Sequence, residues 1–387
     1  MNDMNAKTST RGPLVFENWR AFLNKDEVRS ISEYPLFSDA RVTGEEPDKY
    51  KPYAFLNPVP VDEYIGCFRP IIFVRIENCL QFEIPDMSKT ATEAYHGGAL
   101  VDEIAALVSL ALGIRIRAGK ITRDFQDKID PRGHPVGWGR QPEFLDIDYQ
   151  RLVIPNVISD RALDSLSPIQ RVPSMRPDDA NSLIKAARSY QKALLIAEED
   201  PSMAWLFLVT AIEKAALHWK IVGVSKVDIL KEFMPGLYEK LGTFEKKADV
   251  LSIIADEIYR LVGSQKKFIE FMMEFLPLPP PKRPPAWAQI NWQEEDLKKS
   301  LIAIYKHRSK ALHEGTPFPL PMCDPPSREK NGGKNWHEKP FATAYSGQGG
   351  TWIKEDIPMF LNSFEYIVRQ ALLKWWSELR ILSPPHS

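Results

Sequence analysis

The sequence is short of cysteine and has no long apolar run. Its three cysteines, Cys67, Cys79 and Cys323, are too few and too scattered for a disulfide framework or a zinc site. We therefore expect a reducing, cytoplasmic setting. No segment approaches the roughly 20 apolar residues of a membrane span, and the polar start lacks the apolar core of a signal peptide. We predict no membrane partner and take residues 1–13 as a disordered lead-in.

An excess of charge of one sign is also missing. The formal net charge is -1, so no overall basic field attracts nucleic acid, and any RNA contact must come from a local patch. No Gly-rich phosphate loop follows an expected strand, so neither a Rossmann nor a P-loop enzyme is implied. No carboxylate and histidine cluster has two-metal spacing, so no metal and no cofactor is expected.

What is present is an ordinary globular chain of 387 residues, 44% of them hydrophobic, long enough for two domains with separate cores. Residues 14–165 are typical of a mixed α/β domain. We expect a hairpin over 70–85 that turns at Asn78, a buried helix over 99–112 with apolar residues on nearly all sides, and further strands over 114–117 and 145–154.

The Gly-rich loop 130–139 contains His134 and Trp138. It has two open interpretations. Glycine backbone beside histidine and tryptophan suits a ligand or partner loop, whereas a plain connection is the commoner meaning of such a composition.

A Ser, Pro, Arg and Asp-rich stretch over 160–178 indicates a domain boundary, and the pattern beyond it is helical. Asp178 or Asp179 is expected to cap a helix that runs to Glu199, and Asp200 caps the next one with Pro201 at its first position. Further helices are predicted to start at Ser225, Thr243 and Ser264, with a final one over 355–381. The fold class is therefore α+β, an N-terminal mixed α/β domain followed by an all-α bundle over 178–382, interrupted by a Pro-rich insert at 277–291 and a loop at 316–354.

The stretch 304–315 is expected to end an amphipathic helix. Apolar residues recur at helical spacing and form a stripe along one face of this helix, namely Leu297, Leu301, Ile304, Tyr305 and Leu312. Arg308 occupies a gap in this stripe. A buried guanidinium needs a carboxylate or an anionic ligand. His313 follows before Gly315 ends the helix, about 140° around the axis from Arg308, so the two side chains flank a cleft and do not form a metal pair.

Arg308-x4-His313, with Tyr305 three residues before the arginine, resembles the motif of the HEPN superfamily and is closest to its ApeA-like branch. Residues 200–213 resemble the family's earlier core helix, whose central glutamate corresponds to Glu213. The resemblance covers residues 178–380. Ser309 departs from the Asn, Asp or His of many catalytic members. No tyrosine follows His313 closely, unlike the branch that is silenced by modification of that residue.

The resemblance implies a metal-independent endoribonuclease that uses the RNA 2′-hydroxyl as nucleophile and leaves a 2′,3′-cyclic phosphate. His313 would move protons, Arg308 would hold the phosphate oxygens, and Glu213 would orient Arg308. It also implies a homodimer through the HEPN domain, a role in prokaryotic antiviral defence by abortive infection, and an N-terminal domain that senses an unknown trigger ligand or protein.

Five residues are candidate RNA contacts: His307, Ser309, Lys310, Lys334 and Trp336. We place His307 on the solvated side of its helix, beside Lys306 and Lys310. The loop 316–354 mixes cations with aromatic residues, which suits single-stranded RNA, although a solvated loop with incidental aromatic residues has the same composition.

Each catalytic candidate also has a structural interpretation. Arg308 and Glu213 are able to form a purely structural ion pair, and His313 is placed where a helix dipole stabilises a histidine. The alternative function is therefore a non-catalytic HEPN dimerisation or RNA-binding module.

Overall fold

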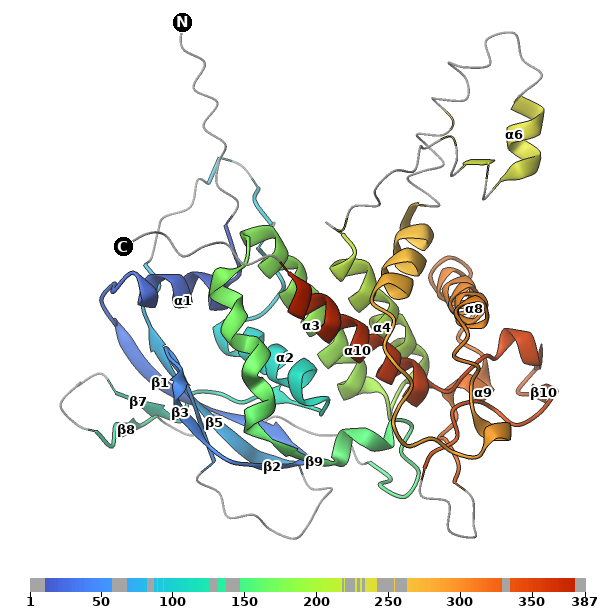
Figure 1. Ribbon diagram of the computed structural model, residues 1–387. Coiled ribbons are helices and arrows are strands. Elements are labelled where there is room, and N and C mark those ends of the chain that lie inside the picture. Colours follow the sequence, from blue (N-terminus) through green and yellow to red (C-terminus); the bar gives the residue numbers. More distant parts are fainter. Residues whose placement is uncertain are drawn as a thin grey trace, which may run out of the picture.

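The structure is a computed structural model. It describes residues 11–57, 68–81, 87–88, 90–92, 94–125, 131–136, 147–217, 219, 227, 230–231, 234–241, 254, 263–328 and 335–379. Helices and sheets are both present, as the sequence predicts for an α+β fold. Most strands precede residue 165 and most helices follow it. The sheet lies at one end of the molecule and the C-terminal helices extend away from it (Figure 1).

Among the described residues, the main sheet has seven strands, and its pairs are antiparallel. The order is β3-β4-β5-β1-β7-β8, with β6 also paired to β1. The strands are β1 Ser30–Ser38, β3 Glu46–Tyr50, β4 Tyr53–Leu56, β5 Arg69–Asn78, β6 Arg117–Ala118, β7 Arg123–Asp124 and β8 His134–Pro135. A separate parallel pair joins β2 Arg41–Thr43 to β9 Asp160–Ala162.

The predicted hairpin is only half right. β5 matches its first strand, but its neighbours are β1 and β4. Leu80 and Gln81 are not in a strand, and residues 82–86 lie outside the described residues. The Cys79 amide donates a 2.8 Å hydrogen bond to Asn18 Oδ1 of helix α1 (Leu14–Leu23), which draws the chain away from a return strand.

Two other strand predictions also need correction. The strand expected over 114–117 shrinks to β6, because Ile114 and Ile116 are buried outside any strand. Residues 147–154 contain no strand, and residues 141–146 lie outside the described part of the chain. In the loop 130–139, His134–Pro135 form the short strand β8, and the rest of the described loop is turn or irregular.

Helix α2 (Leu100–Leu112) is the buried helix that the sequence predicts. It ends at Gly113, whose φ of 68° is left-handed. Two arginines far away in the sequence hold its last carbonyls. Arg161 Nε donates to the Leu112 oxygen at 2.5 Å, and Arg369 donates to the Leu110 and Ala111 oxygens at 3.0 and 2.6 Å. Positive charge at a helix C-terminus is favourable. Because Arg161 and Arg369 come from distant segments, their contacts with α2 link both halves of the chain.

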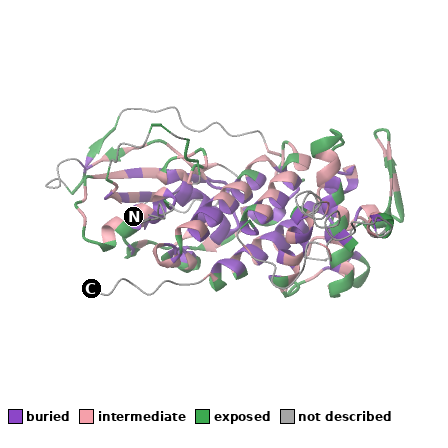
Figure 2. Cartoon of the chain, turned by 90° about the horizontal axis from the view of Figure 1, so that it is seen from above, coloured by how far each residue is buried: buried purple, intermediate pink, exposed green. Residues whose placement is uncertain are grey.

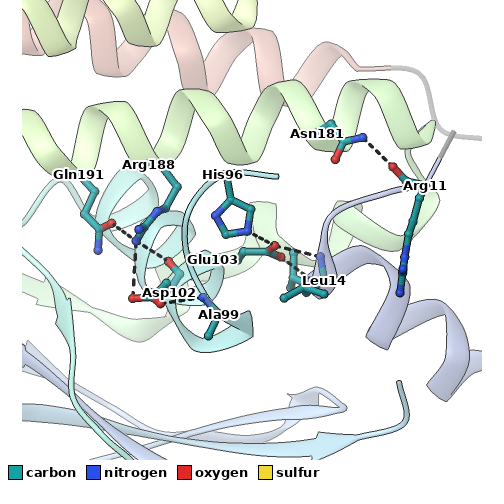
Figure 3. A network of polar contacts seen from close by, with 10 residues as sticks. Arg11, Leu14, His96, Ala99, Asp102, Glu103, Asn181, Arg188 and Gln191 are labelled. Atoms are coloured by element: carbon teal, nitrogen blue, oxygen red, sulfur yellow. Dashed lines mark hydrogen bonds and ion pairs between the residues drawn. The ribbon is translucent and has the colours of Figure 1, made fainter. Parts of the chain in front are cut away.

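A polar network joins α1, α2 and α3 (Pro177–Ile196), as Figure 3 shows. The fully buried Glu103 accepts hydrogen bonds from the first amides of α1, Leu14 at 2.9 Å and Val15 at 2.6 Å, and contacts His96 Nε2. Nearby, Asn181 Nδ2 donates to the Arg11 oxygen at 2.8 Å. A carboxylate at a helix N-terminus satisfies amides that lack intrahelical partners.

Among the described residues, most buried apolar side chains form one cluster that extends from Val15 to Trp376. Figure 2 shows these buried residues, in purple, continuing from the strands through the central helices. Leu230 and Leu241 form a second, small cluster. The larger cluster includes residues from both sides of the predicted boundary. The boundaries at 14–165 and 178–382 stay a prediction from sequence.

The helix starts were predicted with mixed success. Asp200 caps α4 (Pro201–Ala215) through a 2.9 Å bond from the Met203 amide, as expected. The helix α3 begins earlier than expected, with Arg176 as N-cap, because Asp179 is engaged by Arg176 at 2.8 and 2.9 Å. The final helix, α10 (Leu361–Glu378), begins later than expected, after the 3-10 turn η4 (Lys354–Asp356) and Pro358.

The remaining elements lie around these. They are η1 Pro155–Ile158, η2 Leu163–Ser174, α6 Pro235–Leu241, η3 Ala286–Ala288, α8 Glu294–His313, α9 Leu320–Cys323, β10 Ala344–Gly347 and β11 Gly350–Ile353. Residues 263–274 are helical and contain Ser264, whereas the predicted caps Ser225 and Thr243 lie outside the described residues. Arg283 of the Pro-rich insert 277–291 donates two hydrogen bonds, at 2.8 and 2.6 Å, to Glu338 of the loop 316–354, and so joins the two segments.

Candidate functional site

The motif helix forms as predicted. α8 spans Glu294–His313 and buries Leu297, Leu301, Ile304 and Tyr305. Three acidic residues open its first turn, and Lys310 and His313 are in its last turn, an arrangement that suits the helix dipole. Leu312, which the stripe included, is 53% exposed. The buried face therefore ends before the last turn.

Glu213 on α4 and Arg308 on α8 form the ion pair that the sequence predicted. Arg308 Nη2 donates to Glu213 Oε2 at 2.8 Å, and Tyr305 donates its hydroxyl to Glu213 Oε1 at 2.8 Å. The side chains of Arg308 and Glu213 are 20% and 17% exposed. The pair lies at the border between core and solvent, where it is accessible to a ligand and only partly screened by water.

Tyr305 holds the Glu213 carboxylate from the buried side of the pair. It is only 6% exposed, and its ring packs 5.2 Å from Phe268 and 5.3 Å from the Arg308 guanidinium carbon. Burial, followed by the neighbouring Glu213 charge and hydrogen bond, raises the pKa of Tyr305 well above its usual range. The tyrosine is therefore a neutral donor that holds Glu213 in one orientation.

The chain beyond α8 returns to α4 and fixes the spacing of the two helices. Trp205 of α4 stacks on Phe318 at 5.3 Å and on Phe364 at 4.7 Å, and its indole donates to the Met322 oxygen at 3.2 Å. The Phe318 amide donates to Ser202 Oγ at 3.0 Å. These contacts hold the segment that follows α8 against the first half of α4.

His313 is the last residue of α8 and is exposed, with Gly315 two residues beyond it at a φ of 68°. Ser309 and Lys310 are half-buried on the same turn as Arg308. The described contacts include no hydrogen bond between His313 and Arg308 or Glu213. The structure thus brings Arg308 and Glu213 together, and it places His313 on open surface at the end of the same helix.

The expectation for His307 is wrong. His307 is 8% exposed, its Nε2 bonds the Asp356 carbonyl at 2.7 Å, and its ring packs 5.9 Å from Phe318. Burial is the main cause that lowers its pKa. The segment η4 covers this side of α8, so His307 anchors that segment and does not face solvent.

The two candidates in the 316–354 loop differ in what the structure describes. Lys334 lies outside the described residues. Trp336 is half-buried, with the Arg328 guanidinium 3.6 Å above its ring. Trp336 borders a pocket with Trp292, just before the start of α8. The pocket is therefore about 20 Å along the helix axis from Arg308, at 1.5 Å per residue.

Sequence reasoning missed this pocket because four separate segments build it. Tryptophan interleaved with cations in the 316–354 loop was the one signal that pointed to it.

The described residues contain no group of three or more His, Cys, Asp or Glu side chains arranged to hold a metal ion. No helix in the described part of the chain has the length and apolar character needed to cross a membrane. Comparisons with protein-family models, curated proteins and solved structures found no match to the chain. The HEPN resemblance remains a prediction that depends on the motif residues.

Proposed function

We propose that this protein is a metal-independent HEPN endoribonuclease, and the observation that carries the proposal is the Glu213–Arg308 pair. The pair lies at the edge of the core, and its arginine is five residues before the exposed His313 on α8. An arginine held by a carboxylate, itself held by a tyrosine, presents its remaining guanidinium donors in a fixed direction. Fixed donors suit a phosphodiester on which charge develops.

The reaction needs only proton transfer and charge stabilisation. The RNA 2′-oxygen attacks the adjacent phosphorus, its proton passes to a base, and the 5′-oxygen leaves with a proton from an acid. The products are a 2′,3′-cyclic phosphate and a 5′-hydroxyl end. His313 fits the proton-transfer role because an imidazole ring has one nitrogen that accepts a proton and one that donates a proton. Arg308 fits the role of binding the non-bridging oxygens.

One arginine and one histidine per chain are few for this reaction, so we propose a homodimer that brings two α8 ends to one cleft. The exposed His313 and Leu312, which is 53% exposed, leave this end of α8 open for a second copy. A cytoplasmic role in prokaryotic antiviral defence, with the N-terminal sheet region responding to a trigger ligand or protein, follows from the HEPN resemblance and belongs to the same proposal.

The test is cleavage of a single-stranded RNA by wild type, His313→Ala and Arg308→Ala, each in excess EDTA. Both variants should lose about 100-fold or more in rate, the usual range for a missing acid–base group or anion clamp. Lys306→Ala, an exposed change on the same helix, is the matched control and should cleave like wild type. A DNA strand of the same sequence should stay intact. Equal cleavage by His313→Ala and wild type refutes the proposal.

A non-catalytic dimerisation or RNA-binding module is the second candidate. It is favoured by one observation, that Glu213 already neutralises Arg308. This alternative predicts RNA binding without cleavage, and a loss of cooperative unfolding in Arg308→Ala that Lys306→Ala does not share.

A further inference from the structure

A pocket of about 320 Å³ lies between the Pro-rich insert, the 316–354 loop and the start of α10. Three aromatic rings line it: Trp292, Trp336 and Tyr366. The rings of Trp292 and Tyr366 meet edge to face, with centroids 6.3 Å apart. The volume is at the lower end for small-molecule sites, which span about 300–1,000 Å³. The pocket therefore has room for one compact ligand with a flat apolar part.

Two asparagines add polar groups to the wall. Asn156 Nδ2 donates a long hydrogen bond of 3.4 Å to Asn362 Oδ1. This bond does not use Asn156 Oδ1, an acceptor, or Asn362 Nδ2, a donor, so both atoms can bind a ligand in the pocket. Asn362 is buried at 8% exposure, and Asn156 is exposed. An acceptor beside a donor is the pairing that binds the edge of a nucleobase.

The charge of the lining favours an anion. Lys282 and Arg328 are exposed at the pocket, and Arg328 lies against Trp336. The carboxylate of the lining, Glu338, accepts two hydrogen bonds from Arg283 and one from the Ile290 amide at 2.8 Å. Glu338 is therefore already neutralised, and two cations stay available at the rim.

We propose that this pocket binds one nucleotide, with its base against the tryptophans, its base edge at the asparagines and its phosphate at Lys282 and Arg328. Aromatic side chains stack on bases, and cations pair with phosphates. The nucleotide is either a free monophosphate or one residue of a single strand. The site is distinct from Arg308 and His313, so the proposal does not rest on nuclease activity.

The experiment is isothermal titration of the full chain with the four ribonucleoside monophosphates, the matching nucleosides, inorganic phosphate and a single-stranded pentaribonucleotide. At least one monophosphate or the pentanucleotide should bind in a saturable, one-to-one manner. The nucleoside and phosphate alone should bind at least about tenfold more weakly, because each makes only part of the contacts. Binding of a monophosphate identifies a free nucleotide as the source, and binding of the pentanucleotide alone identifies a strand.

Variants of the pocket lining, compared with matched controls, sharpen the test. Trp336→Ala should weaken binding about tenfold or more, whereas Trp336→Phe, which keeps a stacking face, should recover most of the affinity. Trp287→Ala is the matched control, because Trp287 is 46% exposed and outside the pocket lining. If Trp336→Ala unfolds, the exposed Lys282→Glu should still weaken binding of the anionic ligand about tenfold. His313→Ala should bind the monophosphate like wild type, which separates this site from the nuclease proposal.

Two results overturn the inference. One is the absence of saturable binding of every monophosphate and of the pentanucleotide to wild type. The other is an affinity for the nucleotide that stays unchanged in both Trp336→Ala and Lys282→Glu.

Discussion

Replacing Glu213 tests the contact on which the candidate site depends. Glu213→Ala leaves the buried Tyr305 hydroxyl and the Arg308 guanidinium without their shared acceptor, since both donate to this carboxylate at 2.8 Å. Glu213→Gln keeps one acceptor oxygen and adds an amide donor, so Arg308 retains a partner while the negative charge is lost. The two variants therefore separate the hydrogen bonds from the charge.

The magnitude follows from the burial of each group. Leaving the Tyr305 hydroxyl unsatisfied costs about 1–3 kcal/mol. Breaking the ion pair costs about 2 kcal/mol, because side chains about one-fifth exposed lie between a surface pair at about 0–1 kcal/mol and a fully buried one at about 3–5 kcal/mol. The two terms share one carboxylate and do not add fully. We expect a loss in the free energy of unfolding of about 3 kcal/mol for Glu213→Ala and about 1 kcal/mol for Glu213→Gln.

Urea unfolding followed by circular dichroism measures these losses, and a double-mutant cycle with Arg308→Ala isolates the pair. The coupling free energy should be about 1–2 kcal/mol. The exposed Lys299–Asp296 pair of the same helix, with side chains 75% and 46% exposed, is the control and should show almost no coupling. A coupling of zero between Glu213 and Arg308, or equal losses in the alanine and glutamine variants, would refute the reasoning.

Three further predictions concern other parts of the molecule. Gly113→Ala should destabilise the protein more than Gly315→Ala, although both glycines have a φ of 68°. The reason is that a Cβ added at Gly113 would lie 2.6 Å from Arg369 Nε, whereas one added at Gly315 would meet no atom within 4 Å. Urea unfolding should show a loss of about 1–2 kcal/mol for the strained backbone at Gly315 and a larger loss at Gly113. Burial lowers the pKa of His307, so this histidine binds a proton more readily in the unfolded chain than in the folded one. The neutral, buried His307 therefore contributes its full stabilisation above the pKa of an unfolded histidine, near 6.5, and this stabilisation falls as the pH drops below that value. The slope of stability between pH 7 and 5 should therefore flatten in His307→Gln, and an unchanged slope contradicts this. Finally, cleavage should persist in excess EDTA and leave cyclic-phosphate ends, whereas activity that returns only with magnesium or manganese contradicts the proposed chemistry.

The sequence was a good guide where local spacing governs the structure. The helix around Arg308, the Asp200 cap and the buried helix before Gly113 are set by apolar periodicity and capping residues close in the chain. The Glu213–Arg308 pair was also predictable, because a charge on the apolar face of each of two helices needs a partner. These features depend on neighbours within a few turns or on a charge that must be neutralised.

The tertiary structure alone decided which polar groups are buried and which segments meet. His307 looked solvated beside two lysines, although its position three residues after Ile304 was a signal for the buried side. Its burial comes from Asp356, 49 residues away. The same applies to the strand neighbours of β5 and to the pocket at Trp336, whose walls come from four separate segments. Periodicity reports which face of an element is apolar, but the partner that covers a face is set by packing over the whole chain.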